Sequence, residues 1–91
     1  MSDIRVEKQL SIGREAAWAA ALQVAERIQE KADAKYRIVG DSIEFERTGA
    51  KGKITVTDTH VVAEVTLGML LRPMRGLVES KIDEYFARYF A

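Results

Sequence analysis

Apolar and polar residues alternate along the chain from Tyr36 to Leu67, and turn-forming residues interrupt this alternation at three points. A period of two is typical of strands in a sheet that is buried on one face only. The interruptions are Gly40-Asp41, Thr48-Gly49-Ala50-Lys51 and Asp58-Thr59, all of which suit hairpin turns. The pattern therefore predicts an antiparallel meander of four strands.

The lengths of these turns predict how the strands pair. A two-residue turn at Gly40-Asp41, a four-residue loop at 48–51 and a turn at Asp58-Thr59 all keep the apolar residues on one face. The expected cross-strand pairs include Val39–Ser42, Tyr36–Phe45, Phe45–Ile54, Ile43–Val56, Glu46–Lys53, Ile54–Ala63, Val56–Val61 and Lys53–Glu64. The expected inner face is Tyr36, Ile38, Ile43, Phe45, Ile54, Val56, Val61, Ala63, Val65 and Leu67.

Two helices are available to cover this face. Apolar residues recur at helical spacing from Arg14 to about Lys31, where alanines allow close approach to the sheet. The central stripe is Ala17, Ala21, Val24 and Ile28, with Trp18 and Leu22 on its flank. Pro73 suits the first position of a second helix. That helix carries the bulk of the aromatic residues, so we expect it to be the main cover of the sheet.

A first strand precedes the first helix, with Ile4, Val6 and Leu10 at alternate positions. Lys8 breaks this alternation; we expect a rim position where its ammonium reaches water, and a ligand-binding lysine is the alternative. The predicted fold class is α+β, with the order strand, helix, four strands, helix in a single domain over residues 1–91. The strands, counted along the chain, are expected in the order 1-5-4-3-2. They form a curved five-stranded antiparallel sheet with both helices on one face, similar to a helix-grip architecture.

Composition narrows the classes of function. Fourteen basic and fourteen acidic side chains cancel, so there is no broad basic field to attract nucleic acid. The chain has no cysteine, which excludes disulfides, thiolate metal sites and cysteine nucleophiles. The start of the chain lacks the pattern of a signal peptide, and no apolar run is long enough to span a bilayer. We expect a cytoplasmic protein without a membrane span.

No group of residues has the spacing of a catalytic or metal site. The single histidine, His60, is expected at a hairpin turn on the solvent face, apart from other potential ligands. Gly40-Asp41-Ser42 resembles the signature of one class of serine hydrolases, but a hairpin turn is not the exposed elbow that such a serine needs. Glu44, Glu46 and Glu64 face basic residues across the strands, which favours a charge ladder over a carboxylate cluster. We assign no catalytic residue, metal site or cofactor.

The segment Gly68–Met74, which joins the last strand to the last helix, is unusually apolar for a connection. Two interpretations remain open. Its side chains plug the open end of the core, or they form an exposed contact for a partner, a second copy or a lipid-like surface. For the second interpretation, the candidate partner-binding residues are Met69, Leu70, Leu71, Arg72, Met74, Trp18 and Leu22.

Four segments resemble the polyhydroxyalkanoic acid system protein family over nearly the whole chain. They are Ser2-Asp3-Ile4-Arg5-Val6, the hairpin of residues 40–49, the strand of residues 52–58 and Val65-Thr66-Leu67-Gly68-Met69-Leu70-Leu71. The resemblance implies a small bacterial protein linked to polyester storage granules, and it supplies no catalytic residues to carry over.

We therefore expect a non-enzymatic accessory protein that contacts the polyhydroxyalkanoate granule surface or a granule-associated protein, at storage granules. A homodimer is compatible with the sequence. The first alternative is a small acyl- or lipid-binding module of the helix-grip type, although large residues on the inner face leave little room for a cavity. The second is an enzyme acting on hydroxyacyl thioesters, for which the sequence supplies no combination of base, oxyanion site and nucleophile.

Overall fold

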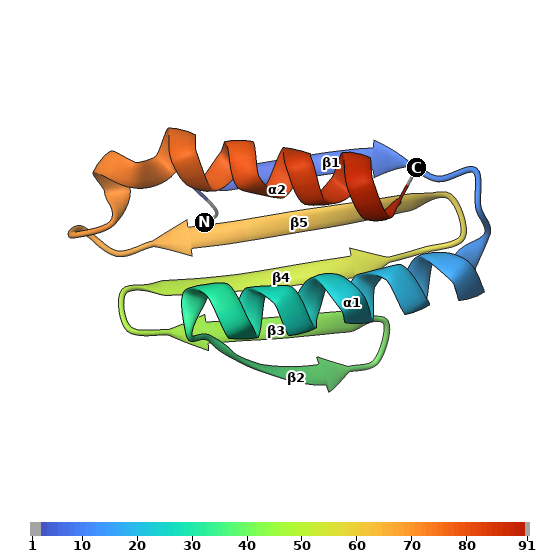
Figure 1. Cartoon of the computed structure of the whole chain (residues 1–91), viewed down its shortest axis with the longest axis horizontal. Coiled ribbons are helices and arrows are strands. Elements are labelled where there is room, and N and C mark those ends of the chain that lie inside the picture. Colours follow the sequence, from blue (N-terminus) through green and yellow to red (C-terminus); the bar gives the residue numbers. More distant parts are fainter. Residues whose placement is uncertain (1–2, 91) are drawn as a thin grey trace.

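A single sheet is covered on one face by two helices in the computed structural model, which describes residues 3–90 (Figure 1). Three residues lie outside the described range: Met1, Ser2 and Ala91. The first two belong to the segment in which the sequence predicts no signal peptide. The strands are β1 (Ile4–Gln9), β2 (Lys35–Val39), β3 (Ser42–Arg47), β4 (Ala50–Val56) and β5 (His60–Leu67). The helices are α1 (Arg14–Ala32), the short 3-10 helix η1 (Arg72–Met74) and α2 (Arg75–Tyr89).

The strand order is β1-β5-β4-β3-β2 with all neighbours antiparallel, which confirms the predicted topology. The predicted registers of β2 with β3 and of β4 with β5 are also confirmed, as the pairs Val39–Ser42 and Val56–Val61 show. Gly40 has a φ of 59° and Asp41 does not have a positive φ, which matches a type II′ turn with glycine at its first central position.

The predicted register of β3 with β4 is wrong by two residues. Thr48-Gly49 forms a two-residue turn instead of the expected four-residue loop, because Gly49 adopts a positive φ of 86° that closes the hairpin early. Phe45 consequently lies opposite Gly52, and Lys53 lies opposite Glu44. A shift of two residues keeps each side chain on its predicted face.

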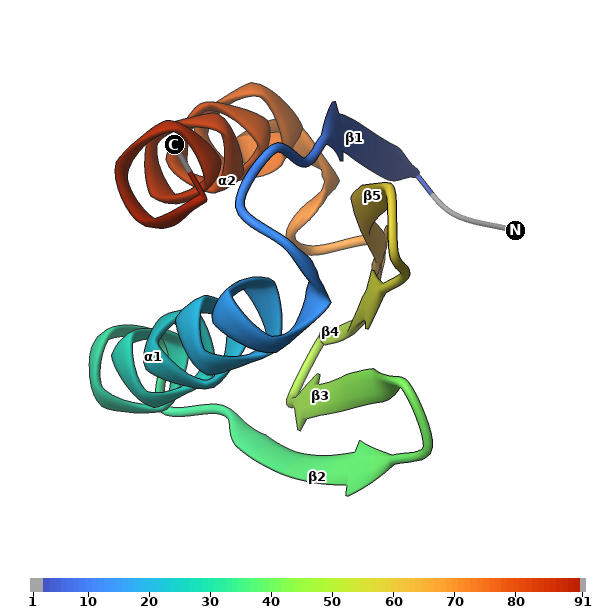
Figure 2. The ribbon, with the colours of Figure 1, turned by 90° about the vertical axis from the view of Figure 1, so that its right-hand side faces the viewer.

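The two helices share the cover of the sheet, with α1 over β2, β3 and β4 and α2 over β1 (Figures 1 and 2). This differs from the expectation that the second helix is the main cover. The five buried residues of α1 are Ala17, Ala20, Ala21, Val24 and Ala25. Phe86 is the one buried residue of α2, and Phe90, the residue that follows the end of this helix, is also buried. Small side chains let α1 approach the sheet closely, whereas α2 contacts the core with its C-terminal half.

The C-terminal end of α2 carries an aromatic pair and a hydrogen bond to α1. The rings of Phe86 and Phe90 meet edge to face with centroids 5.2 Å apart. On the helix surface, Nε of Arg27 in α1 donates a hydrogen bond to the Tyr89 hydroxyl at 3.3 Å. This hydrogen bond raises the pKa of Arg27 above its usual value.

Candidate functional site

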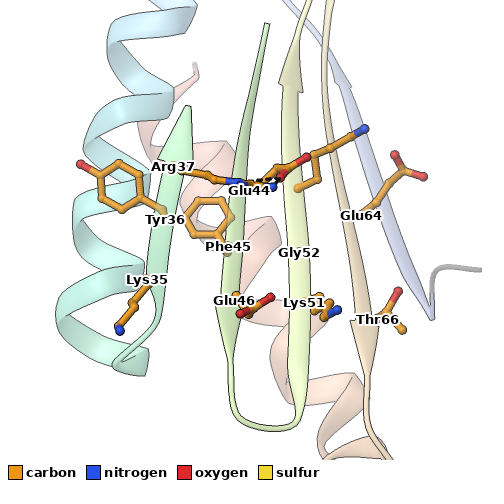
Figure 3. A pocket seen from close by; sticks show the side chains of 11 residues that line it. Lys35, Tyr36, Arg37, Glu44, Phe45, Glu46, Lys51, Gly52, Glu64 and Thr66 are labelled. Carbon is orange, nitrogen blue, oxygen red and sulfur yellow. Dashed lines mark hydrogen bonds and ion pairs between the residues drawn. The ribbon is translucent and has the colours of Figure 1, made fainter. Parts of the chain in front are cut away.

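The outer face of the sheet carries an open hollow of about 650 Å³ above strands β2 to β5 (Figure 3). A transverse row of directly opposed charged residues crosses this face: Arg37, Glu44, Lys53, Glu64 and, on β1, Arg5. Nη2 of Arg37 lies 2.9 Å from Oε1 of Glu44. Because the signs alternate, neighbouring charges neutralise one another, which confirms the predicted charge ladder. The row stabilises the pairing of strands and offers no single-sign field to a charged ligand.

The residues considered for catalysis are engaged in local hydrogen bonds. Nδ1 of His60 lies 2.8 Å from the hydroxyl of Thr59, its neighbour in the chain. Oγ of Ser42 lies 2.9 Å from Oγ1 of Thr55 on the adjacent strand, so it occupies a regular strand position and not a strained elbow. Within residues 3–90, no group of three or more histidine or acidic residues could hold a metal ion. Among the helices of residues 3–90, none combines the length and the apolar composition that spanning a bilayer requires.

The connection between β5 and η1 is a hydrogen-bonded turn anchored to the β3–β4 turn. The amide of Gly68 donates to the carbonyl of Gly49 at 2.6 Å. The amides of Leu71 and Arg72 both donate to the carbonyl of Gly68, at 3.0 and 3.1 Å. Met69 and Leu70 are therefore the two central residues of a closed turn, held in place by its backbone.

The residues of this segment differ in how far they are exposed. Leu71 is half-buried, with its side chain against Gly49 in the neighbouring turn. Met69 and Leu70 point into solvent and are 84% and 92% exposed. Large apolar side chains are unusual at the centre of a turn, where glycine, proline, asparagine and aspartate are favoured. Nothing in the fold requires these two side chains.

The exposed apolar surface continues into α2. Met74 is 45% exposed, and Leu77, one turn later, is 55% exposed. We call Met69, Leu70, Met74 and Leu77 the junction patch. Leu77 does not face the core, because α2 packs against the core through its C-terminal half. Leu77 follows Met74 by three residues, which is helical spacing, and this spacing is the sequence signal that could have placed Leu77 in the junction patch.

Two arginines flank the junction patch. Arg72 and Arg75 are exposed, and neither has an ion-pair partner among residues 3–90. An arginine side chain has an aliphatic stem that can lie along apolar surface while its charged group stays in water. An apolar patch with arginines at its rim is typical of a surface that binds at an interface.

Trp18 and Leu22 do not join this patch. Both are half-buried against the core, and Trp18 lines a second hollow together with Arg14 and the Gly40-Asp41 turn. The junction instead contacts the Thr48-Gly49 turn, at the other end of β3. At about 3.3 Å per residue, the strand separates the two turns by roughly 20 Å. The candidate residues thus belong to two surfaces.

A test of the anchor is the substitution Gly68→Ala. A β-carbon at residue 68 would lie 3.1 Å from the Gly49 carbonyl oxygen, so one of the two backbones has to move. We expect the free energy of unfolding in urea to fall by about 1–3 kcal/mol. Gly76→Ala is the matched control, because a β-carbon there meets nothing within 4 Å and should be neutral or slightly stabilising. Equal effects of the two substitutions would contradict the close approach at Gly68.

The fold and the site define a small α+β protein with a one-sided antiparallel sheet, a charge-balanced outer face and an exposed apolar turn before its last helix. It belongs to the family described as "putative polyhydroxyalkanoic acid system protein", whose model matches residues 4–90. This match confirms the resemblance seen in the sequence. No protein of curated function and no solved structure gives a significant match. The family description names a storage-polyester system and no reaction.

Proposed function

We propose that this protein is a non-enzymatic accessory protein of polyhydroxyalkanoate storage that contacts the surface of the polyester granule through the junction patch. One observation carries the proposal. Met69 and Leu70, at the centre of a hydrogen-bonded turn, expose nearly their whole side chains to water. The family supplies the context, and this turn supplies an apolar contact that the fold does not need.

The anchoring of the turn favours binding. Because the backbone of Gly68, Leu71 and Arg72 is already hydrogen-bonded, little backbone conformational entropy is lost when Met69 and Leu70 meet a surface. Arg72 and Arg75 can remain at the boundary between the granule and water, where their charged groups stay hydrated. The patch is therefore suited to lying on an apolar surface and not to insertion into a deep pocket.

The size of the patch limits its strength. Complete burial of each of its four side chains yields roughly 1.5–3 kcal/mol. Association costs about 4–15 kcal/mol in lost translational and rotational freedom. A single patch therefore binds weakly and reversibly, and firm attachment needs more than one patch at a time.

The core argues against the acyl-binding alternative. Side chains of the sheet and of both helices fill the space between the layers, with Ile43, Val56, Val61 and Val24 fully buried there. Phe86 and Phe90 occupy the part beneath α2. The two hollows described above lie on the outer face and beside the Gly40-Asp41 turn, outside this space.

Cosedimentation with polyester particles tests the proposal. The protein should pellet with granules that have been stripped of their own proteins, and the double variant Met69→Ser/Leu70→Ser should remain in the supernatant. Both side chains are exposed, so this variant should keep the stability of the parent chain to within about 0.5 kcal/mol. Loss of binding would then report on the contact and not on folding.

The control carries two serines elsewhere: Ala16→Ser/Ala19→Ser, on the exposed side of α1. It should pellet like the parent protein. Unchanged pelleting of the Met69/Leu70 double variant would exclude the junction patch. Binding to native granules but not to stripped ones would exclude direct contact with the polyester surface and would identify a granule protein as the partner.

A further inference from the structure

A second exposed apolar surface follows the open edge of β2, which pairs with β3 on one side and has no strand on the other within residues 3–90. Ile38, predicted to face the core, is 55% exposed, and Val39 is exposed beside it. Ile38 is exposed although it was predicted to be buried, because the edge strand β2 curves past the helix layer, as Figure 2 shows. We call these residues the β2 edge surface: Trp18, Leu22 and Ile38 on the helix side of the edge, and Val39 on the outer side.

The flank of α1 that carries Trp18 is the flank next to β2. Trp18 lines a hollow with Gly40 and Asp41, which directly follow β2 in the chain. Arg27, nine residues or two and a half turns later, lies on the opposite flank and contacts Tyr89 of α2. Leu22 follows Trp18 by one turn and lies on the same flank.

The turn after β2 determines which backbone groups point to the open edge. The two residues that flank a two-residue turn, here Val39 and Ser42, form a hydrogen-bonded pair. Along an antiparallel pair of strands, hydrogen-bonded pairs alternate with non-hydrogen-bonded pairs. The N–H and C=O groups of Tyr36 and Ile38 therefore point away from β3. Unpaired groups of this kind are a template for another strand.

The other edge of the sheet is protected against such pairing. β1 carries Lys8 on its inner face, and its outer face carries Arg5, Glu7 and Gln9. An inward-pointing charge on an edge strand is one of the devices that prevent association. On β2 the inner positions hold Tyr36 and Ile38 instead.

We propose that β2 pairs in antiparallel fashion with β2 of a second copy of this chain, about a two-fold axis at Ile38. The two sheets then form one continuous sheet. Trp18 and Leu22 of both copies close the interface on the helix side. Tryptophan is enriched at the centres of protein interfaces, where its large surface is removed from water.

Outward-pointing backbone groups of the two β2 strands can meet with the two-fold axis at Tyr36, at Arg37 or at Ile38. The charges on β2 favour the axis at Ile38. An axis at Arg37 sets Arg37 against Arg37, and an axis at Tyr36 sets Arg37 against Lys35; like charges directly opposite each other are destabilising. An axis at Ile38 sets Ile38 against Ile38 and Arg37 against Val39. It also brings Lys35 level with the turn that carries Asp41, whose carboxylate pairs with Arg14 of its own copy and would then lie between two cations. This axis is the one nearest Trp18.

The mass of the protein in solution tests the proposal directly. Because the paired strands are short, the dimer should form with increasing protein concentration in the micromolar to millimolar range. Sedimentation equilibrium should show the mass rising from 10.2 kDa towards twice that value. Trp18 is the only tryptophan of the chain, so its fluorescence should shift to shorter wavelength over the same range as the ring leaves water. A mass that stays at 10.2 kDa throughout would overturn the proposal.

A matched pair of lysine variants locates the interface. Ile38→Lys places two ammonium groups at the two-fold axis and should raise the dimer dissociation constant about tenfold or more. Leu77→Lys changes a residue of equal exposure, 55%, in the junction patch and should leave dimerisation unchanged. Dimerisation that resists Ile38→Lys, or that is lost only in Leu77→Lys, would reject the β2 edge.

Cysteine cross-linking tests the register, and the absence of natural cysteines makes it specific. Ile38→Cys places two thiols across the axis, at the distance of directly opposed residues, within the range that a disulfide bridges. Tyr36→Cys separates the thiols by four residue positions. Under mild oxidation Ile38→Cys should form a covalent dimer much faster than Tyr36→Cys, and the reverse order would reject an axis at Ile38.

Discussion

Replacing Phe86 with alanine should lower the free energy of unfolding by about 3–5 kcal/mol, a large part of the stability of a small domain. Phe86 is the one residue within α2 that is buried, at 3% exposure. Its loss leaves a cavity between α2 and the sheet and removes the edge-to-face contact with Phe90. Urea denaturation followed by circular dichroism measures the change.

Leu77→Ala on the same helix is the control for Phe86→Ala. Leu77 is more than half exposed, so its truncation should change the free energy of unfolding by no more than about 0.5 kcal/mol. If the two variants lost equal stability, the N-terminal turns of α2 would also be packed, and the junction patch would not be free to bind. The pair therefore tests the stability of the fold and the premise of the proposed function together.

Most of the fold follows from local patterns in the sequence. Alternation and turn residues predict the strand order and two of the three hairpin registers, because a shift by one residue would expose a whole apolar face. The third register was wrong because the sequence does not show whether Thr48-Gly49 closes alone or with Ala50 and Lys51. The choice depends on the positive φ of Gly49 and on its contact with Gly68, which lies far along the chain.

The candidate site was harder to predict because it depends on three-dimensional placement. The sequence identified the apolar junction but could not show that Leu71 turns inward while Met69 and Leu70 turn outward. It also grouped Trp18 and Leu22 with the junction, from which they are separated by the length of β3. Composition alone does not give such distances. The open edge of β2 becomes visible only when the order of the strands and the position of α1 are known together.

The monomeric variant Ile38→Lys should bind granules about 100-fold more weakly than the parent protein, although its junction patch is unchanged. A two-fold axis normal to the sheet keeps the helix layers of both copies on one side, so two junction patches are available to one surface. After the first patch binds, the second binds as an intramolecular step. Two contacts that are individually weak thereby become one firm attachment. Cosedimentation over a range of protein concentrations measures the change.

The combination of variants separates the two proposals. Met69→Ser/Leu70→Ser should still dimerise, because it changes nothing on the β2 edge surface, yet it should not pellet with granules. Ile38→Lys should be monomeric and should pellet only at high concentration, where single patches suffice. If Ile38→Lys is monomeric and pellets like the parent protein, one patch is enough and dimerisation serves another purpose. If the serine variant pellets normally while its dimerisation is intact, the granule contact lies elsewhere and the β2 pairing stands by itself.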